Sequence, residues 1–371
     1  MSSLGGPENS QFNLTQYIDD WQGDWGAKNP VNQQTPGVKG ETGFAVVQSD
    51  GSFNPQYSIS PVQGQAWNYG ATAGNTALAI GGWTNSQPPS GGLWQVLQPT
   101  DPSSPQASLS PAAQNLINNI CNNVGSNSPQ GENYQTVTLD YESFASTKPG
   151  QIANVNAFVQ ELSTRLGQLD PPVKLEMAIS PLSTNQQYFT LSAVTPYVST
   201  FQVMNYDYAV GNANVADNAS VSQTISTLKD LVSEGVPESK ISVGVPFYGR
   251  QFEVAKGLTQ AEVEQQLQSG RLQVTGSQSP ITDDDILNTI GDWNAPQSPW
   301  INVQDGESPP GQFYYNSDTG TIISAMNPKE LESLATAIKE NFPGVNQAFG
   351  YEGYGDQKAQ MVQQMIQDFN G

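Results

Sequence analysis

An aspartate and a glutamate lie two residues apart in the apolar, β-branched run TVTLDYESF, residues 136–144. In a β-strand, alternate side chains share a face at a spacing of roughly 6.6 Å, so Asp140 and Glu142 point the same way. Two carboxyl groups crowded on one buried face favour the protonated form of one of them, which is what general acid catalysis needs at neutral pH. From this stretch alone, an edge strand that shows its polar face to water is the alternative.

The composition removes several kinds of chemistry. The chain of 371 residues has no histidine, which excludes Ser-His-Asp and Cys-His catalysis and His-ligated zinc. Acid–base chemistry must therefore come from Asp, Glu, Tyr, Lys or the single cysteine. The formal charge of -21, from 13 basic and 34 acidic residues, argues against nucleic acid and anionic membranes as partners. A neutral substrate is compatible with this charge.

The location of the protein is indicated only by composition. No apolar run approaches the ~20 residues of a membrane span, and the first residues, MSSLGGPENSQFNL, lack the basic start and apolar stretch of a secretory signal. The richness in Asn, Gln, Ser, Thr and Pro, with few lysines, resembles extracellular proteins. We expect an extracellular protein, with the cytoplasm as the alternative, and the sequence leaves the oligomeric state open.

Eight short apolar runs are typical of buried strands. They are FNLTQYI from Phe12, GFAVVQ from Gly43, TALAIGG from Thr76, TVTLDYE from Thr136, VKLEMAIS from Val173, FQVMNYD from Phe201, KISVGVPF from Lys240 and QAFGYEG from Gln347. Amphipathic segments with apolar residues at three- and four-residue spacing lie between and after them and predict helices. These segments are PAAQNLINNICNNV, NVNAFVQELSTRLGQL, VSQTISTLKDLVSEG, NPKELESLATAIKENF and QKAQMVQQMIQDF.

Alternating strands and helices predict a parallel sheet, and eight such units predict a closed (β/α)₈ TIM barrel that spans residues 1–371. A doubly wound open sheet is the alternative. The interval 251–318 is too long for a simple connection, and we interpret it as a small inserted α+β subdomain after strand 7. In a barrel of this kind the site lies at the carboxyl ends of the strands. Asp140 and Glu142 lie near such an end, which weakens the edge-strand interpretation.

Several motifs in the chain resemble those of family 18 glycoside hydrolases, the chitinases and their relatives. LDYE resembles the end of the family's DxxDxDxE signature, and the other motifs follow in the family's order. They are AIGGWTNS at 79–86, MNYD at 204–207, GVPFYGR at 244–250, and the passage from YYNSDTGTIISAMNPKEL to FGYEGYGD in the last strand. The interval after strand 7 lies where many members carry a chitinase insertion domain.

The resemblance implies catalytic roles for four residues. Glu142 matches the general acid, and Asp140 matches the aspartate that orients the substrate's 2-acetamido group. That acetamido oxygen, in place of an enzyme carboxylate, attacks the anomeric carbon. Tyr206 would hydrogen-bond the acetamido carbonyl, and Asp207 would lie near the −1 sugar.

The resemblance also implies residues that bind the substrate without reacting. Arg250 would brace the strand-7 side, and Met204 belongs to the strand-6 motif. Trp83, Trp300 and Tyr351 form a candidate aromatic platform for sugar rings. No cofactor and no metal are expected, and the run 283–285, DDD, is interpreted as a solvated face rather than a calcium loop.

The chain departs from the family pattern at five positions. The signature aspartates are replaced by Gln135 and Thr138, the strand-3 serine by Ala79, the strand-8 tryptophan by Tyr351, and the aromatic after the glutamate by Ser143. We expect Ala79 and Thr138 to lie side by side in the barrel. With no second carboxyl group behind it, Asp140 is expected to be less strongly protonated and to lean toward Glu142.

Three functions are compatible with these residues. The first is a retaining endo-chitinase that cleaves β-1,4-linked N-acetylglucosamine polymers, with chitin or chito-oligosaccharides as substrate. The second is a weakly active or inactive chitinase-like lectin that binds such chains. The third is a hydrolase of peptidoglycan or of an N-glycan core. Retention of Glu142 favours an enzyme over a lectin, and the insertion favours long linear substrates over N-glycans.

Overall fold

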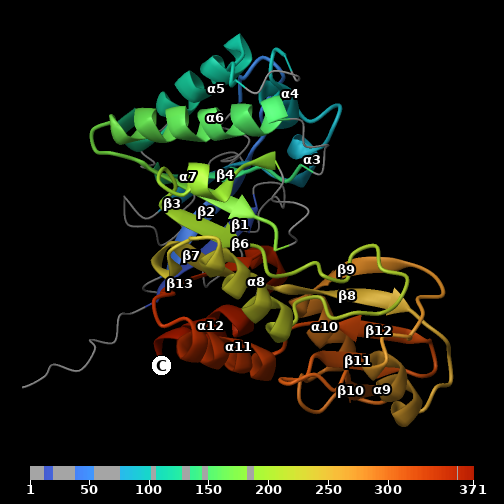
Figure 1. Cartoon of the computed structure of the whole chain (residues 1–371). Coiled ribbons are helices and arrows are strands. Elements are labelled where there is room, and N and C mark those ends of the chain that lie inside the picture. Colours follow the sequence, from blue (N-terminus) through green and yellow to red (C-terminus); the bar gives the residue numbers. More distant parts are fainter. Residues whose placement is uncertain are drawn as a thin grey trace, which may run out of the picture.

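The computed structural model describes residues 12–19, 38–53, 76–101, 106–127, 134–143, 149–181, 188–356 and 358–371. Eight parallel strands close into a barrel in the order β1-β13-β7-β6-β5-β4-β3-β2, which confirms the predicted (β/α)₈ fold (Figure 1). The barrel strands are β1 (Asn13–Asp19), β2 (Val38–Ala45), β3 (Thr76–Gly81), β4 (Tyr134–Asp140), β5 (Lys174–Ile179), β6 (Thr200–Val203), β7 (Ile241–Pro246) and β13 (Gln347–Tyr351).

Strand β2 begins earlier than the apolar run predicted from Gly43. Val38 already pairs with Leu14 of β1, and the strand ends at Ala45, where its register against β3 shifts. The apolar residues beyond Ala45 instead make an isolated bridge between Val47 and Phe53. Pairing with β1 therefore sets the strand, and it brings the polar segment before Gly43 into the barrel wall.

The helices cover the outside of the barrel. The long ones are α5 (Pro111–Cys121), α6 (Pro149–Gly167), α8 (Val221–Ser233), α11 (Pro328–Asn341) and α12 (Gln360–Asn370), and they match the predicted amphipathic segments. Short helices α3 (Trp83–Ser86), α4 (Gly92–Val96) and α7 (Leu191–Val194) lie in the connections. The side chains of Ser110, Ser220 and Asn327 accept hydrogen bonds from backbone N–H groups in the first turns of α5, α8 and α11.

A second, antiparallel sheet projects from one side of the barrel (Figure 1). Its strands, in the order β10-β11-β12-β8-β9, are β8 (Tyr248–Glu253), β9 (Gln278–Thr282), β10 (Trp300–Gln304), β11 (Gln312–Asn316) and β12 (Thr321–Ser324), with α9 (Gln260–Gln268) and α10 (Asp283–Ile290). Along β11, Phe313 and Tyr315 pack in one apolar cluster and Tyr314 in another, because alternate residues face opposite sides of the sheet. The sheet extends on both sides of the predicted range 251–318.

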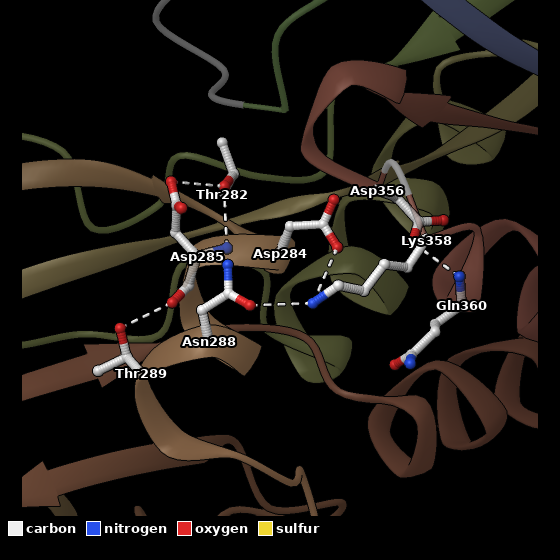
Figure 2. Close-up of polar contacts among 8 residues, drawn as sticks. All are labelled: Thr282, Asp284, Asp285, Asn288, Thr289, Asp356, Lys358 and Gln360. Carbon is white, nitrogen blue, oxygen red and sulfur yellow. Dashed lines mark hydrogen bonds and ion pairs between the residues drawn. The ribbon is translucent and has the colours of Figure 1, made fainter. Parts of the chain in front are cut away.

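Helix α10 fastens this subdomain to the segment that follows β13 (Figure 2). Lys358 Nζ donates to Asn288 Oδ1 at 3.0 Å and lies 3.8 Å from Asp284 Oδ1. The interpretation of DDD as a solvated face is wrong for Asp283, which is only 2% exposed. Burial, and then the charge of Asp356, raise the pKa of Asp283 well above its usual value. The run begins a helix that packs against β8 and β9 of the inserted sheet and against the segment after β13, so its first carboxyl group is covered.

Within the described residues, no helix combines the length and the apolar character needed to cross a membrane.

Candidate active site

The carboxyl end of β4 carries the two predicted carboxyl groups, and the end of β3 holds that strand in place. Gly82 N–H donates to the Asp140 carbonyl oxygen at 2.9 Å, and the Ser86 hydroxyl reaches the same oxygen at 3.2 Å. Gly81 has φ 113°, and a Cβ there would lie 2.2 Å from that oxygen. Gln87 Nε2 donates to the Glu142 carbonyl at 2.7 Å. Residues 81–87, GGWTNSQ, therefore hold the backbone that carries both carboxyl groups.

Asp140 and Glu142 are both held toward their protonated forms. Asp140 is 3% exposed, and burial, followed by the charges of Glu142 and Glu41, raises its pKa well above the usual value. Glu142 is half-buried, and burial together with the charge of Asp207 raises its pKa to about 7. A carboxyl group with a pKa near neutrality can both give and take a proton at the pH of most biological reactions.

Asp207 and Arg250 form an ion pair across two elements. Arg250, on β8, donates from Nη2 to Asp207 Oδ1 at 3.0 Å, and the Arg250 side chain is 11% exposed while that of Asp207 is 46% exposed. The backbone of Asp207 has φ 62°, a left-handed conformation that Asp tolerates better than most residues. The charge that raises the pKa of Glu142 is thus positioned by a backbone turn and by an arginine from the inserted sheet.

A group of tyrosines lies beside the carboxyl groups. Tyr206 stacks on Tyr351, with ring centroids 5.7 Å apart and an interplanar angle of 15°. Tyr248 meets Tyr206 edge-on at 5.9 Å, and Tyr17 meets Tyr351 in the same way at 5.3 Å. Burial raises the pKa of Tyr206, so its hydroxyl stays a neutral hydrogen-bond donor. Met204, predicted to bind substrate, is partly buried and packs against the barrel core.

A cavity of about 1220 Å³ opens at the ends of β2 and β3. Its wall includes Trp83, which is 51% exposed, together with Phe44, Phe53 and Tyr351. It borders the catalytic candidates, because Gly81 and Gly82 line it and contact Asp140, while Tyr351 lines it and stacks on Tyr206. The described lining does not include Trp300, which packs instead beside the Trp293 and Tyr314 cluster of the inserted subdomain.

Sequence reasoning missed a polar network in the barrel interior. Gln202 of β6 lies at its centre and donates from Nε2 to Glu41 Oε2 at 2.6 Å and to Glu176 Oε2 at 3.0 Å. The Tyr17 hydroxyl donates to Gln202 Oε1 at 2.7 Å. Burial and the charge of Glu176 raise the pKa of Glu41 to about 8. Glu41 lies in the segment that pairs with β1. This segment has no alternation of apolar and polar residues, so nothing in the sequence indicated that Glu41 is buried.

The expectation of an interior without a second carboxyl group behind Asp140 is therefore wrong. Ala79 and Thr138 do lie side by side, as register partners of β3 and β4, and both are fully buried. This interior carboxyl group is that of Glu41, which lies on β2 and not on β4. Its charge is one of the causes that raise the pKa of Asp140.

Across the described residues, no group of three or more Asp, Glu, His or Cys side chains is arranged to hold a metal ion. The polar groups at the strand ends are instead two carboxyls, an aspartate–arginine pair and buried phenols. This set can transfer protons and bind neutral polar groups.

Comparisons with known proteins agree with this architecture. The family model for glycosyl hydrolases family 18 matches residues 42–345. The chain belongs to glycosyl hydrolase family 18. It shares the hydrolase barrel of this chitinase family, so the resemblance of its strand-end motifs is confirmed at the level of the family.

Three solved structures share the fold. An N-acetylglucosaminidase from Paenibacillus barengoltzii is 16% identical, with a TM-score of 0.70 over 96% of this chain and 100% of that one. A mutant class V chitinase from Nicotiana tobaccum in complex with NAG4 is also 16% identical, with a TM-score of 0.70 over 97% and 99%. The multi-modular cell-surface chitinase ChiW from Paenibacillus sp. str. FPU-7 is 16% identical, with a TM-score of 0.70 over 97% of this chain but only 43% of that one.

Proposed function

We propose that this family 18 protein is a retaining glycosidase that cleaves β-1,4-linked N-acetylglucosamine chains, with chitin or chito-oligosaccharides as substrate. The observation that carries the proposal is Glu142, a half-buried carboxyl with a pKa of about 7 that lies two residues beyond Asp140 at the end of β4. The neighbouring cavity, with Trp83 and Tyr351 in its wall, suits stacked sugar rings.

In the proposed reaction Glu142 first acts as an acid. Its proton passes to the glycosidic oxygen, and the bond between that oxygen and the anomeric carbon breaks. The carbonyl oxygen of the substrate's own 2-acetamido group bonds to the anomeric carbon and gives an oxazolinium ion. Asp140 accepts a hydrogen bond from the acetamido N–H, and the Tyr206 hydroxyl orients the acetamido oxygen. The Glu142 carboxylate that remains after the proton transfer offsets the positive charge of the oxazolinium ion.

Glu142 then acts as a base in the second half of the reaction. A water molecule gives one proton to the Glu142 carboxylate and bonds to the anomeric carbon, which releases the acetamido oxygen. Two successive inversions return the β configuration. Because burial and Asp207 hold the pKa of Glu142 near 7, both directions of proton transfer are accessible at neutral pH.

A substrate panel tests the chemistry. Chito-oligosaccharides should be cleaved, whereas cello-oligosaccharides, which lack the acetamido group, should bind without cleavage. A thiazoline that mimics the oxazolinium ion should inhibit competitively. Cleavage of cello-oligosaccharides at a comparable rate would contradict the mechanism, and tight binding of chito-oligosaccharides with no turnover would instead identify a chitinase-like lectin.

The proposed substrates are polymers, which lie outside the cell, and the composition also resembles that of extracellular proteins. We propose an extracellular protein on this basis. Detection of the native protein in the culture medium or on the cell surface tests this, and its confinement to the cytoplasm would contradict it.

A further inference from the structure

A second cavity, of about 400 Å³, lies between the inserted sheet and the first turns of α11. This volume is within the roughly 300–1,000 Å³ of small-molecule sites. None of its described lining residues also lines the cleft beside Asp140 and Glu142. The lining residues that matter here are Trp293 and Asn294 after α10, Asn302 and Gln304 on β10, Gln312 on β11, and Asn327 at the start of α11.

The inserted sheet separates this cavity from the proposed catalytic residues. On β11, Gln312 and Tyr314 point to one face of the sheet and Phe313, between them, points to the other. Phe313 pairs with Ser324, and Ser324 pairs with Arg250, so Arg250 lies on the Phe313 face. The cavity, which Gln312 lines, is therefore across the sheet from the arginine of the ion pair near the cleft.

The cavity is rich in side-chain amides, which both donate and accept hydrogen bonds. Asn302 Nδ2 donates to Gln312 Oε1 at 3.3 Å, and Gln312 Nε2 donates to the Pro310 carbonyl oxygen at 3.0 Å. Asn327 Nδ2 donates to the Tyr314 hydroxyl at 3.0 Å. Each of these bonds orients an amide and uses only one of its two N–H groups, so further donors remain for a ligand. The five amides are Asn294, Asn302, Gln304, Gln312 and Asn327.

Trp293 adds an aromatic wall and an unused donor. Its side chain is 5% exposed, and its Nε1 is buried without a hydrogen-bond partner among the described residues. A buried indole N–H normally has a partner, because leaving it unpaired costs free energy. The backbone of Trp293 is held in place by the Tyr314 hydroxyl, which donates to its carbonyl oxygen at 3.0 Å. The missing acceptor is one that a ligand in the adjoining cavity can supply.

The wall of this cavity is close to neutral. Lys329 is the only cation in the described lining, and it is exposed. Glu330 is 3% exposed, and burial, followed by the charge of Asp217, raises its pKa well above the usual value, so it is held toward its neutral form and takes no part in binding. An anion would also approach a chain with a net charge of -21. These features favour a neutral ligand with many hydroxyl or amide groups.

We propose that this cavity is a second carbohydrate site, which binds one neutral sugar unit of the N-acetylglucosamine class without cleaving it. The amides of Asn302 and Gln304 bind the hydroxyl and acetamido groups of the sugar, and Trp293 Nε1 donates to one of its oxygens. In the polymer-cleaving enzyme proposed above, the site holds a second stretch of the chain away from the cleft. That last role rests on the proposed function, whereas the binding of a single sugar does not.

NMR of the tryptophan side chains tests the site directly. The seven tryptophans give seven indole N–H signals, and Trp293→Phe and Trp83→Phe assign the two that matter. When N-acetylglucosamine is titrated into the wild type, the Trp293 signal should shift and saturate with a Kd on the order of 1 mM, as expected for a ligand of this size. The Trp83 signal gives a separate curve for the cleft, so the two sites are measured in one experiment.

Two substitutions at the cavity and one matched control show whether the shift comes from this site. Gln304→Ala and Asn302→Ala should each raise the Kd read from Trp293 about fivefold, since each removes one polar partner, and should leave the Trp83 curve in place. Gln265→Ala changes another exposed glutamine of the inserted subdomain, on α9, which packs on the Phe313 face of the sheet. It should leave both curves unchanged.

Three results would overturn the proposal. One is a Trp293 signal that does not move up to about 50 mM N-acetylglucosamine, roughly fifty times the expected Kd. Another is a Kd from Trp293 that is equal in the wild type, Gln304→Ala and Asn302→Ala. The third is a Trp293 signal that responds to inorganic phosphate and not to the sugar, which would identify an anion site at Lys329.

Binding to insoluble chitin tests the role in holding a polymer. Glu142→Gln, which should not turn chitin over, is compared with the double variant that also carries Gln304→Ala, and the double variant should be retained at least about twofold less. Equal retention would overturn the polymer-holding role. If the wild type cleaves no chito-oligosaccharide, the proposed function fails, yet the Trp293 titration still decides whether the second site binds sugar.

Discussion

Glu142 is an effective acid only because of the residues around it. Burial raises its pKa, and the charge of Asp207, which lies beyond the end of β6, adds to the effect. Arg250 holds Asp207 at 3.0 Å and balances part of its charge. The protonation of Glu142 therefore depends on Asp207, which is held by Arg250 from the inserted sheet.

Asp207→Asn tests this dependence at the scale of one residue. Asparagine tolerates the left-handed backbone at φ 62°, so the fold should be kept, but the negative charge is lost. Because that charge raises the pKa of Glu142, the alkaline limb of the kcat/KM profile should move from about pH 7 to lower pH. Asp207→Ala is the control for the backbone and should in addition lose roughly 1 kcal/mol of stability, measured by urea unfolding. An alkaline limb that stays in place in Asp207→Asn would contradict the assigned coupling.

At the scale of elements, the end of β3 is the least tolerant part of the site. Gly81→Ala would place a Cβ 2.2 Å from the Asp140 carbonyl oxygen in a backbone with φ 113°. We expect a loss of more than about 3 kcal/mol in the free energy of unfolding, since both strain and overlap must be relieved. Gly257→Ala is matched in its positive φ of 73° but meets nothing within 4 Å, so it should lose only about 1 kcal/mol. Equal losses in the two variants would show that the contact with Asp140 is unimportant.

The elements also show how far the sequence could predict the site. Buried parallel strands have continuous apolar runs, which is why the sequence predicted β4, β5 and β7 correctly. Strand β2 begins in the polar segment VKGETGF, where the pairing with β1 decides the structure, and so Glu41 was missed. Trp300 was expected at the cleft because it is aromatic, but it is partly buried and packs against the Trp293 and Tyr314 cluster of the inserted subdomain. Such long-range pairing leaves no local pattern.

The whole molecule carries many buried carboxyl groups, and these set its response to pH. The pKa is raised to about 6 for Asp217, about 7 for Glu142 and Asp356, and about 8 for Glu41. Each of these groups keeps a proton in the folded protein up to its raised pKa. In the unfolded chain the same group loses its proton at the ordinary pKa of Asp or Glu, about 4 to 4.5. By linkage, the stability contributed by these protons is fully present below the unfolded pKa and falls as pH rises to the folded pKa.

We therefore expect the free energy of unfolding to decrease from pH 5 to pH 8. Urea unfolding at several pH values measures this free energy. The same series in about 0.5 M salt, which screens surface charges, separates the effect of the net charge of -21 from that of the buried groups. The decrease should be shallower in Glu41→Gln, which lacks one of the groups. Stability that increases over this range would contradict the assignment of protonated interior carboxyls.

The most direct measurement for the account as a whole is proton NMR of chitohexaose cleavage, followed from the first turnover. The wild type should release the β-anomer first, and Glu142→Gln should be slower by at least about 10², the usual effect of removing a positioned acid. Glu330→Gln, at a buried carboxyl away from the proposed chemistry, should cleave like the wild type. Initial release of the α-anomer, or undiminished cleavage by Glu142→Gln, would contradict the central claim that Glu142 is the acid of a retaining, substrate-assisted hydrolysis.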